Sequence, residues 1–329
     1  MFNLIKIKEY RFELVLILFI CISLLISDGG IGNAQSLPLS TKDQQAEEFL
    51  NHAFNNREGV NATSVQRKWL DIPYATLSDA EKLDIYLPNE GEGAFPVVVA
   101  IHGGSFIRGD KRDFQIVPIM EALKQGYAVV SINYRLSGEA KFPSQINDVK
   151  AAIRWIRANA EQYALNPKKI AVWGDSAGGN LAALVGTSGN VKELEDLSLG
   201  NSDQSSNVSA VVDWYGPINF LTIGDIQRLE RVGNKLIGKP INEAHELYLA
   251  ANPETYIRSD NPPFFIQHGN TDKIIPVQQS IDFAAKLENV LGKNKVTFEI
   301  IDGADHLDEA FNTPENIKKV LDFLDRYLK

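Results

Sequence analysis

One serine in this sequence has the surroundings of a nucleophile. Ser176 is the central residue of GDSAG (residues 174–178), which follows an apolar run and precedes a segment rich in alanine and leucine. This order predicts a strand, a sharp turn and a helix, and the turn raises the serine hydroxyl at the end of the strand. Side chains at residues 174 and 178 would collide with so sharp a turn, which accounts for the two glycines. We therefore predict that Ser176 is a catalytic nucleophile.

A serine hydroxyl needs a base to remove its proton, and the base needs a carboxylate to orient it. His306 lies on the loop after the last long apolar run. This loop is at the carboxyl end of the predicted sheet, where catalytic groups of open α/β sheets gather. Asp272 lies on the loop after the preceding strand. Asp302 and Asp305 are alternative acids, but their closeness to His306 in the chain hinders a favourable approach. The predicted triad is Ser176, Asp272 and His306.

A glycine-containing loop, HGGSF (residues 102–106), follows another predicted strand. A tetrahedral intermediate of acyl transfer bears an oxyanion that must meet preorganised N–H donors. Glycines let the backbone approach a substrate closely, so this loop is predicted to supply donors together with the N–H of Ala177. His102 is predicted to stiffen the loop rather than to act as a second base.

Short β-branched runs alternate with helical patterns from about residue 70 onward. The runs are continuously apolar, which is typical of strands buried on both faces of a parallel sheet. Alternating strands and helices predict right-handed crossovers and a doubly wound, mostly parallel α/β sheet. The predicted strands are residues 96–101, 127–134, 170–173, 210–214, 263–267 and 296–301. One helix is predicted around residues 146–156 and another from Thr313-Pro314, a plausible N-cap followed by proline.

The N-terminal residues have the layout of a secretory signal peptide. Basic residues precede an apolar run of 13 residues, Leu14–Ile26, and a small-residue pattern ending at Ala34 follows it. A bilayer span needs about 20 residues, so a retained N-terminal anchor is the less favoured alternative. We expect a secreted or periplasmic protein whose mature chain begins at Gln35 and lacks the single cysteine, Cys21.

The rest of the chain divides into three predicted parts. Residues 35–69 are a polar, helix-prone lead-in segment, and residues 70–329 are the catalytic domain. Within that domain, residues 218–262 separate two strands by more than an ordinary connection and are predicted to be a small helical cap insertion.

Composition excludes several classes of protein. The 329 residues include 33 Lys and Arg against 42 Asp and Glu, a formal net charge of −9. This acidic balance argues against nucleic-acid binding, which needs a basic surface. No Cys/His cluster has zinc-ligand spacing. We expect no metal and no organic cofactor, and contact with a membrane only if the leader is retained. The oligomeric state is not predicted.

Five motifs in order resemble the α/β-hydrolase fold: HGGSF, NYRLSGEAKFP, GDSAGGN, HGNTDKIIP and GADH. Within it, residues 70–329 resemble the hormone-sensitive-lipase-type and acetyl-xylan/feruloyl-esterase-like carboxylesterases. The resemblance implies a nucleophile, an acid and a base at Ser176, Asp272 and His306. It also implies oxyanion donors at Gly104, Ser105 and Ala177.

Two departures bear on these implications. Hormone-sensitive-lipase-type enzymes usually read HGGG where this chain has Ser105, which leaves the donors open among Gly103, Gly104 and Ser105. Ser137-Gly138 stands where those lipases often have Ala-Pro. The first departure points towards the xylan-esterase-like branch.

The expected function is hydrolysis of short-chain acyl esters through an acyl-enzyme, with a small-molecule or polysaccharide-linked substrate such as an acetyl or feruloyl ester. A lipase, formamidase or peptidase would use the same triad, although the charged residues of the cap segment argue against long-chain lipids. The alternative from another class is a secreted, non-catalytic binding module with a hydrolase fold. Such modules commonly lose a triad residue, whereas this chain has all three.

Overall fold

The computed structural model describes residues 41–224 and 233–329. The leader predictions, including Cys21, lie outside these residues. The chain divides into a unit of Met1–Lys42 and a unit of Asp43–Lys329, and the description below concerns the second. Within the described residues, every helix is too short or too polar to cross a membrane.

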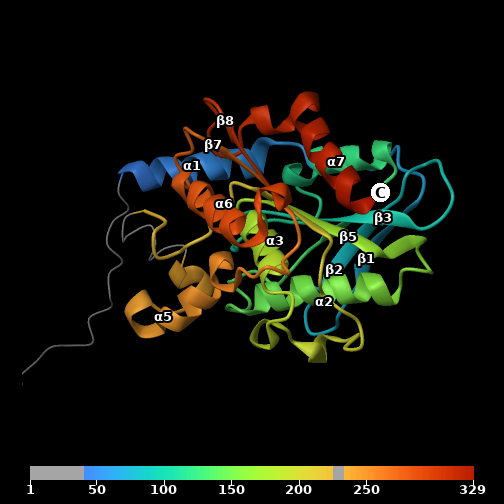
Figure 1. Ribbon diagram of the computed structural model, residues 1–329, viewed down its shortest axis with the longest axis horizontal. Helices are drawn as coiled ribbons and strands as arrows, with labels where there is room; N and C mark the ends of the chain where they lie inside the picture. The colour runs from blue at the N-terminus through green and yellow to red at the C-terminus, as the bar shows by residue number, and fades with distance from the viewer. Residues whose placement is uncertain (1–40, 225–232) are drawn as a thin grey trace, which may run out of the picture. The chain divides into compact units, whose positions relative to one another are not determined.

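An eight-stranded sheet in the order β1-β2-β4-β3-β5-β6-β7-β8 forms the centre of this unit (Figure 1). Strands β3 to β8 pair in parallel, and β2 pairs antiparallel with both β1 and β4. The predicted mostly parallel α/β sheet is therefore confirmed. The strands are β1 Lys68–Pro73, β2 Lys82–Tyr86, β3 Phe95–Ile101, β4 Ala128–Ile132, β5 Leu165–Asp175, β6 Ala210–Trp214, β7 Phe264–Gly269 and β8 Val296–Ile301.

Helices cover both faces of the sheet, as the continuously apolar strands predicted. Side chains of β3 alternate between two cores: Val97 and Val99 belong to the core that includes side chains of α2, α3 and α6, whereas Val98 and Ala100 belong to the core that includes side chains of α7. Figure 1 shows α2 and α3 on one face and α7 on the other. The α-helices are α1 Thr41–Asn56, α2 Ser144–Ala158, α3 Ala177–Thr187, α5 Ile241–Ala250, α6 Gln278–Leu291 and α7 Pro314–Leu328. Short 3-10 helices span Phe114–Ile116, Pro118–Gln125, Lys192–Leu194, Leu197–Leu199, Pro253–Tyr256, Lys293–Lys295 and Glu309–Asn312.

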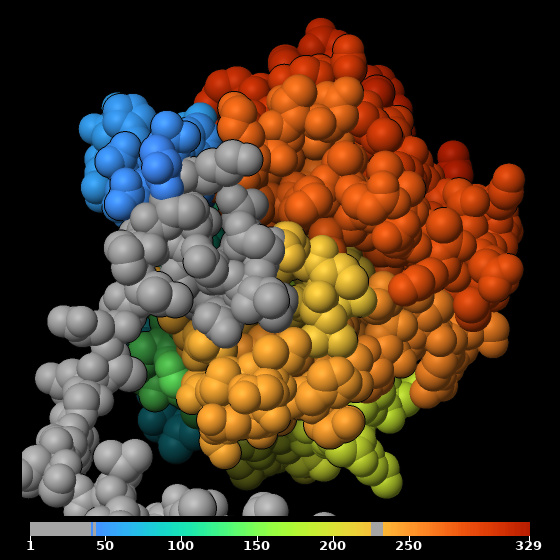
Figure 2. Space-filling view, turned by 90° about the vertical axis from the view of Figure 1, so that its left-hand side faces the viewer, coloured from blue at the N-terminus to red at the C-terminus, as the bar shows by residue number. Residues whose placement is uncertain are grey.

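The N-terminal helix α1 lies close to segments near the C-terminus. Figure 2 shows α1 in blue on the same face as the red segments. Just after α1, Arg57 donates a hydrogen bond from Nη1 to the carbonyl oxygen of Leu307 at 2.9 Å and pairs with Glu309 at 3.4 Å. The lead-in segment thus contacts the loop that follows β8.

The predicted cap insertion, residues 218–262, contains α5 and the 3-10 helix Pro253–Tyr256. Residues 225–232 of this segment lie outside the described residues. Its role as a cap stays a prediction.

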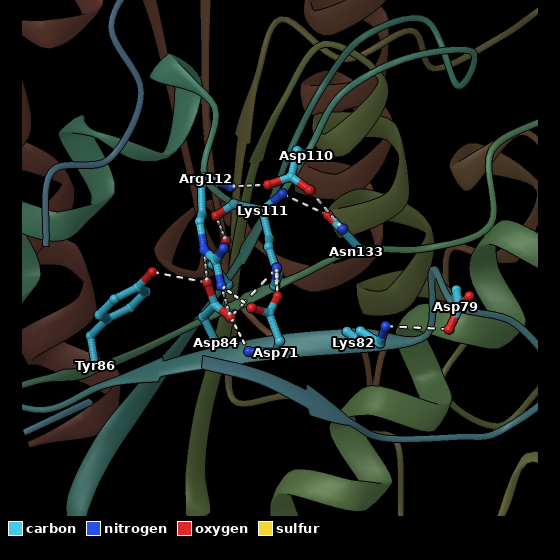
Figure 3. Close-up of polar contacts among 10 residues, drawn as sticks. Asp71, Asp79, Lys82, Asp84, Tyr86, Asp110, Lys111, Arg112 and Asn133 are labelled. Atoms are coloured by element: carbon cyan, nitrogen blue, oxygen red, sulfur yellow. Dashed lines mark hydrogen bonds and ion pairs between the residues drawn. The ribbon is translucent and has the colours of Figure 1, made fainter. Parts of the chain in front are cut away.

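A network of charged side chains connects β1 and β2 to the loop after β3 (Figure 3). Asp84 of β2 is fully buried and accepts from Arg112 Nε at 2.5 Å and from Tyr86 Oη at 3.0 Å. The Lys111 ammonium lies 3.5 Å from Asp84 and 2.6 Å from Asp71. The backbone N–H of Asp71 also donates to Asp84, at 2.7 Å. The two N-terminal strands, which the sequence analysis did not predict, are held to the sheet partly by these contacts.

The same network fixes the loop against the end of β4. The backbone N–H of Lys111 donates to Asn133 Oδ1 at 2.6 Å, and Asn133 Nδ2 donates to Asp110 at 2.8 Å. Because residues 107–113 continue the glycine-containing loop, these contacts limit its movement.

Replacing Asp84 with asparagine is expected to lower the free energy of unfolding by about 3–5 kcal/mol, because buried Lys111 loses part of its compensating charge. Urea-induced unfolding measures this change. Asp79→Asn is the matched control, since exposed Asp79 forms only a 3.3 Å surface pair with Lys82 (Figure 3). Equal unfolding midpoints for the two variants would contradict the structural role of Asp84.

Candidate active site

Ser176 occupies the sharp turn between β5 and α3, in a strained conformation with φ 51° and ψ −121°. A Cβ atom on Gly174 would lie 2.3 Å from the carbonyl oxygen of Gly178, so this position must be glycine for the turn to form. A Cβ atom on Gly178 would lie 2.1 Å from the carbonyl oxygen of Ile101. The second glycine therefore makes room for the end of β3 and not only for the turn.

The structure brings the three predicted triad residues together at the carboxyl ends of β5, β7 and β8. His306 Nε2 lies 3.0 Å from Ser176 Oγ, and His306 Nδ1 lies 2.7 Å from Asp272 Oδ2. Because Nδ1 faces a carboxylate, it carries the ring hydrogen, and Nε2 accepts the serine hydroxyl. The ring of His306 is fully buried and Ser176 is 8% exposed.

Asp272 is held as an ionised carboxylate. Its Oδ1 accepts backbone hydrogen bonds from Ile274 and Ile275 at 2.7 and 2.8 Å. Burial by itself would raise the pKa of Asp272, but the neighbouring His306 and His268 outweigh burial and lower this pKa well below its usual range. A permanently charged acceptor is suited to orienting His306.

The two alternative acids bond elsewhere. Asp302 accepts from the Asn270 side chain at 2.7 Å. Asp305 Oδ1 accepts from the backbone N–H groups of Lys273 and His306, at 2.9 and 2.8 Å, and its carboxylate pairs with the Lys273 ammonium. Both carboxylates thus hold the loops around the triad and not the ring of His306.

The glycine-containing loop runs directly beside the serine. A Cβ atom on Gly103 would lie 3.2 Å from Ser176 Cβ, and Gly104 and Ser105 have φ values of 108° and 56°. Ala177 begins α3, so its N–H has no acceptor within the helix. The assignment of oxyanion donors to Gly104, Ser105 and Ala177 stays a prediction that this arrangement allows.

His102 is fully buried at the base of the same loop. Its Nδ1 lies 2.8 Å from the carbonyl oxygen of Gly103, and its ring stacks on Tyr134 with centroids 4.4 Å apart. Burial lowers the pKa of His102 to about 4, so the ring is neutral at ordinary pH. These contacts agree with the predicted loop-stiffening role.

Among the residues that lie against the triad, sequence reasoning assigned no role to Tyr215 and Asp175. Tyr215, just after β6, packs its ring edge-on against His306 with centroids 4.7 Å apart. Its hydroxyl donates to Asp175 Oδ2 at 3.3 Å, which also accepts from Gln115. Burial raises the pKa of Asp175 to about 7. Tyr215 and Asp175 both lie at strand ends, which was the available signal in the sequence, but this position does not show where their side chains point.

Replacing Asp175 with asparagine is expected to change how stability depends on pH. A carboxyl with pKa 3.8 when unfolded and about 7 when folded stabilises the fold at low pH, and this contribution is lost as pH rises from about 4 to 7. Asparagine does not titrate and can still accept from Gln115 and Tyr215. The free energy of unfolding of Asp175→Asn, relative to that of the natural protein, should therefore rise by roughly 2–3 kcal/mol between pH 5 and pH 8. If the unfolding free energies of the variant and the natural protein differed by a constant amount across this pH range, the prediction would be wrong.

Among the described residues, no group of three or more His, Cys, Asp or Glu side chains is arranged to hold a metal ion.

The sheet order, the strained turn at Ser176 and the positions of Asp272 and His306 after β7 and β8 define the α/β-hydrolase fold. The chain belongs to the BD-FAE family, whose model matches residues 83–287, more than half of the 329. It is 34% identical to the probable carboxylic ester hydrolase LipM of Mycobacterium tuberculosis over 67% of this chain and 52% of that protein. The chain thus spans about half the length of this relative.

Two solved structures are similar over most of the chain. A truncated form of a carbohydrate esterase from gut microbiota is 32% identical with a TM-score of 0.75, covering 82% of this chain and 99% of that one. A bifunctional GH43-CE protein of Bacteroides eggerthii is 37% identical with a TM-score of 0.73, covering 80% of this chain and 35% of that one. The family resemblance expected from the motifs is confirmed.

Proposed function

We propose that this protein is a serine carboxylesterase that hydrolyses short-chain acyl esters through an acyl-enzyme. The observation that carries the proposal is the continuous hydrogen-bonded arrangement of Ser176, His306 and Asp272, with separations of 3.0 and 2.7 Å. Such an arrangement activates a hydroxyl that is otherwise a weak nucleophile.

Acylation begins when Ser176 Oγ bonds to the acyl carbon and its proton passes to His306 Nε2. The carbonyl electron pair moves onto oxygen, and N–H groups of the glycine-containing loop and Ala177 stabilise this oxyanion. When the intermediate collapses, the bond to the alcohol oxygen breaks and that oxygen takes the proton from Nε2. The products are the free alcohol and an acyl-Ser176 enzyme.

Deacylation repeats these steps with water. A water molecule gives a proton to His306 Nε2 while its oxygen bonds to the acyl carbon. Collapse breaks the bond to Ser176 Oγ, which regains the proton, and the carboxylic acid is released. Asp272 stays ionised throughout and stabilises the imidazolium form of His306.

The proposed substrate is an acetyl or other short acyl ester attached to a carbohydrate, including feruloyl esters. Two similar structures of at least 32% identity are described as a carbohydrate esterase and as a bifunctional GH43-CE protein. This similarity supports the substrate class without specifying the sugar or the acyl group.

A panel of esters tests the proposal. The purified protein is assayed with p-nitrophenyl esters from acetate to palmitate, acetylated xylan, a feruloyl ester and p-nitroacetanilide, and is also treated with a fluorophosphonate probe. We expect labelling by the probe, and hydrolysis that is highest for acetate and acetylated or feruloylated carbohydrate. A preference for palmitate would indicate a lipase, and preferential anilide cleavage would indicate an amidase. Absence of both labelling and hydrolysis would support the binding-module alternative.

A further inference from the structure

A second buried histidine contacts the carboxylate of Asp272. His268, near the end of β7, is fully buried, and its Nε2 lies 3.2 Å from Asp272 Oδ2. The same Nε2 lies 2.9 Å from the carbonyl oxygen of Ile275. On the other side of the ring, Nδ1 lies 2.7 Å from Ser280 Oγ of α6. The contacts form a chain from Ser280 through His268, Asp272 and His306 to the hydroxyl of Ser176.

The neighbours of His268 determine where its ring hydrogen lies. Nε2 faces two acceptors, a carboxylate and a carbonyl, so it must be the N–H nitrogen. Nδ1 is then a lone-pair acceptor, and the Ser280 hydroxyl donates to it. The Ser280 hydroxyl thereby satisfies this tautomer and holds the ring with its N–H towards Ile275 and Asp272.

Asp272 consequently has four polar neighbours. Its Oδ1 accepts hydrogen bonds from the backbone of Ile274 and Ile275. Its Oδ2 accepts from His306, and His268 Nε2 forms an ion-pair contact with the same oxygen. Oδ2 is thus shared between the ring that contacts Ser176 and a ring that does not. Each donor removes freedom of rotation from the carboxylate and disperses its charge.

We propose that His268, oriented by Ser280, is a positioning residue that fixes Asp272 and limits how strongly its Oδ2 attracts the proton on His306. This inference rests on the proposed function. Without the second donor, Oδ2 would interact more strongly with a positively charged His306. The protonated, inactive form of the base would then persist to higher pH, and the carboxylate would be free to rotate.

The other titratable groups near His268 and Asp272 are the same in every variant tested. Asp213 of β6 interacts electrostatically with His268, and Asp175 of β5 with His306. Tyr215 and Lys273 interact with Asp272. Tyr215 also faces the ring of His268, with centroids 6.4 Å apart. A shift that differs between substitutions of His268 therefore reports the hydrogen bond that each substitution keeps or removes.

Two substitutions of similar size separate positioning from packing. In His268→Gln the amide carries two hydrogens, which match the two acceptors at Ile275 and Asp272, whereas His268→Met fills the space without a donor. We expect His268→Met to lower kcat about tenfold with KM within twofold, and to move the acid limb of the kcat/KM profile up by about 0.5 pH unit. His268→Gln should restore most of kcat and leave the acid limb near its natural position.

The assays use the full chain with p-nitrophenyl acetate, and circular dichroism confirms folding. Equal losses in the Met and Gln variants with an unmoved acid limb would overturn the proposal, because a packing role predicts that result. If His268→Met does not fold, Ser280→Ala decides: an upward shift of its acid limb supports the proposal and an unmoved limb overturns it. A natural protein without esterase activity would refute the proposed function, whereas normal behaviour of His268→Met in an active enzyme would refute only this inference.

Discussion

Replacing Ser176 with alanine is expected to lower kcat/KM for p-nitrophenyl acetate by roughly 10⁴- to 10⁶-fold, because the acyl-enzyme can no longer form. Alanine keeps the Cβ atom, so the strained backbone at φ 51° is equally strained before and after the substitution. The neighbouring His306, Asp272 and Ala177 also stay in place. The loss should therefore come from the missing hydroxyl and not from a rearranged turn.

Two measurements check this explanation. Thermal unfolding of Ser176→Ala should match that of the natural protein, and the fluorophosphonate probe should no longer label it. Ser202→Ala is the matched control, since Ser202 is exposed on a loop far along the chain from the triad and should keep full activity and labelling. Esterase activity in Ser176→Ala above one hundredth of the natural level would require another nucleophile.

The sequence predicted the strands that carry the candidate site because each contains a short apolar run. These runs are buried throughout in β7 and in the second half of β5, whereas β8 is only partly buried. The first and last residues of β6 and β8 are those predicted, 210–214 and 296–301. The glycines around Ser176 and the position of His306 after the last strand restrict the site further, since strand ends of a parallel sheet converge. Local patterns therefore sufficed to select Ser176, Asp272 and His306 as residues that the structure brings together.

The missed features depend on contacts between distant parts of the chain. Strand β1 is mostly exposed and lacks the apolar run used to predict strands. Asp84 of β2 pairs with Arg112, which lies on the loop after the next strand along the chain. His268 and Tyr215 were visible at strand ends, but which ring faces Asp272 or His306 depends on side-chain direction. Such directions follow from packing across neighbouring strands, which one sequence does not specify.

Replacing Asp272 with asparagine is expected to lower kcat by roughly 10³- to 10⁴-fold, because no orientation of the amide suits its surroundings. With the amide nitrogen at the present Oδ2 position, its hydrogens face the N–H groups of His306 and His268. With the amide reversed, the hydrogens face the backbone N–H groups of Ile274 and Ile275. The first orientation favours the wrong tautomer of His306, which places a hydrogen on Nε2 and leaves Ser176 without an acceptor.

The two alternative acids provide the comparison that makes this prediction specific. Asp302→Asn should keep full activity, because Asp302 bonds to the exposed Asn270 side chain. Asp305→Asn should lose less than tenfold, because Asp305 orders the loop backbone and does not reach the ring of His306. If Asp305→Asn lost more activity than Asp272→Asn, the carboxylate that orients the base would be Asp305. The 2.7 Å contact between Asp272 and His306 would then be structural, and His268 would have no acid to position.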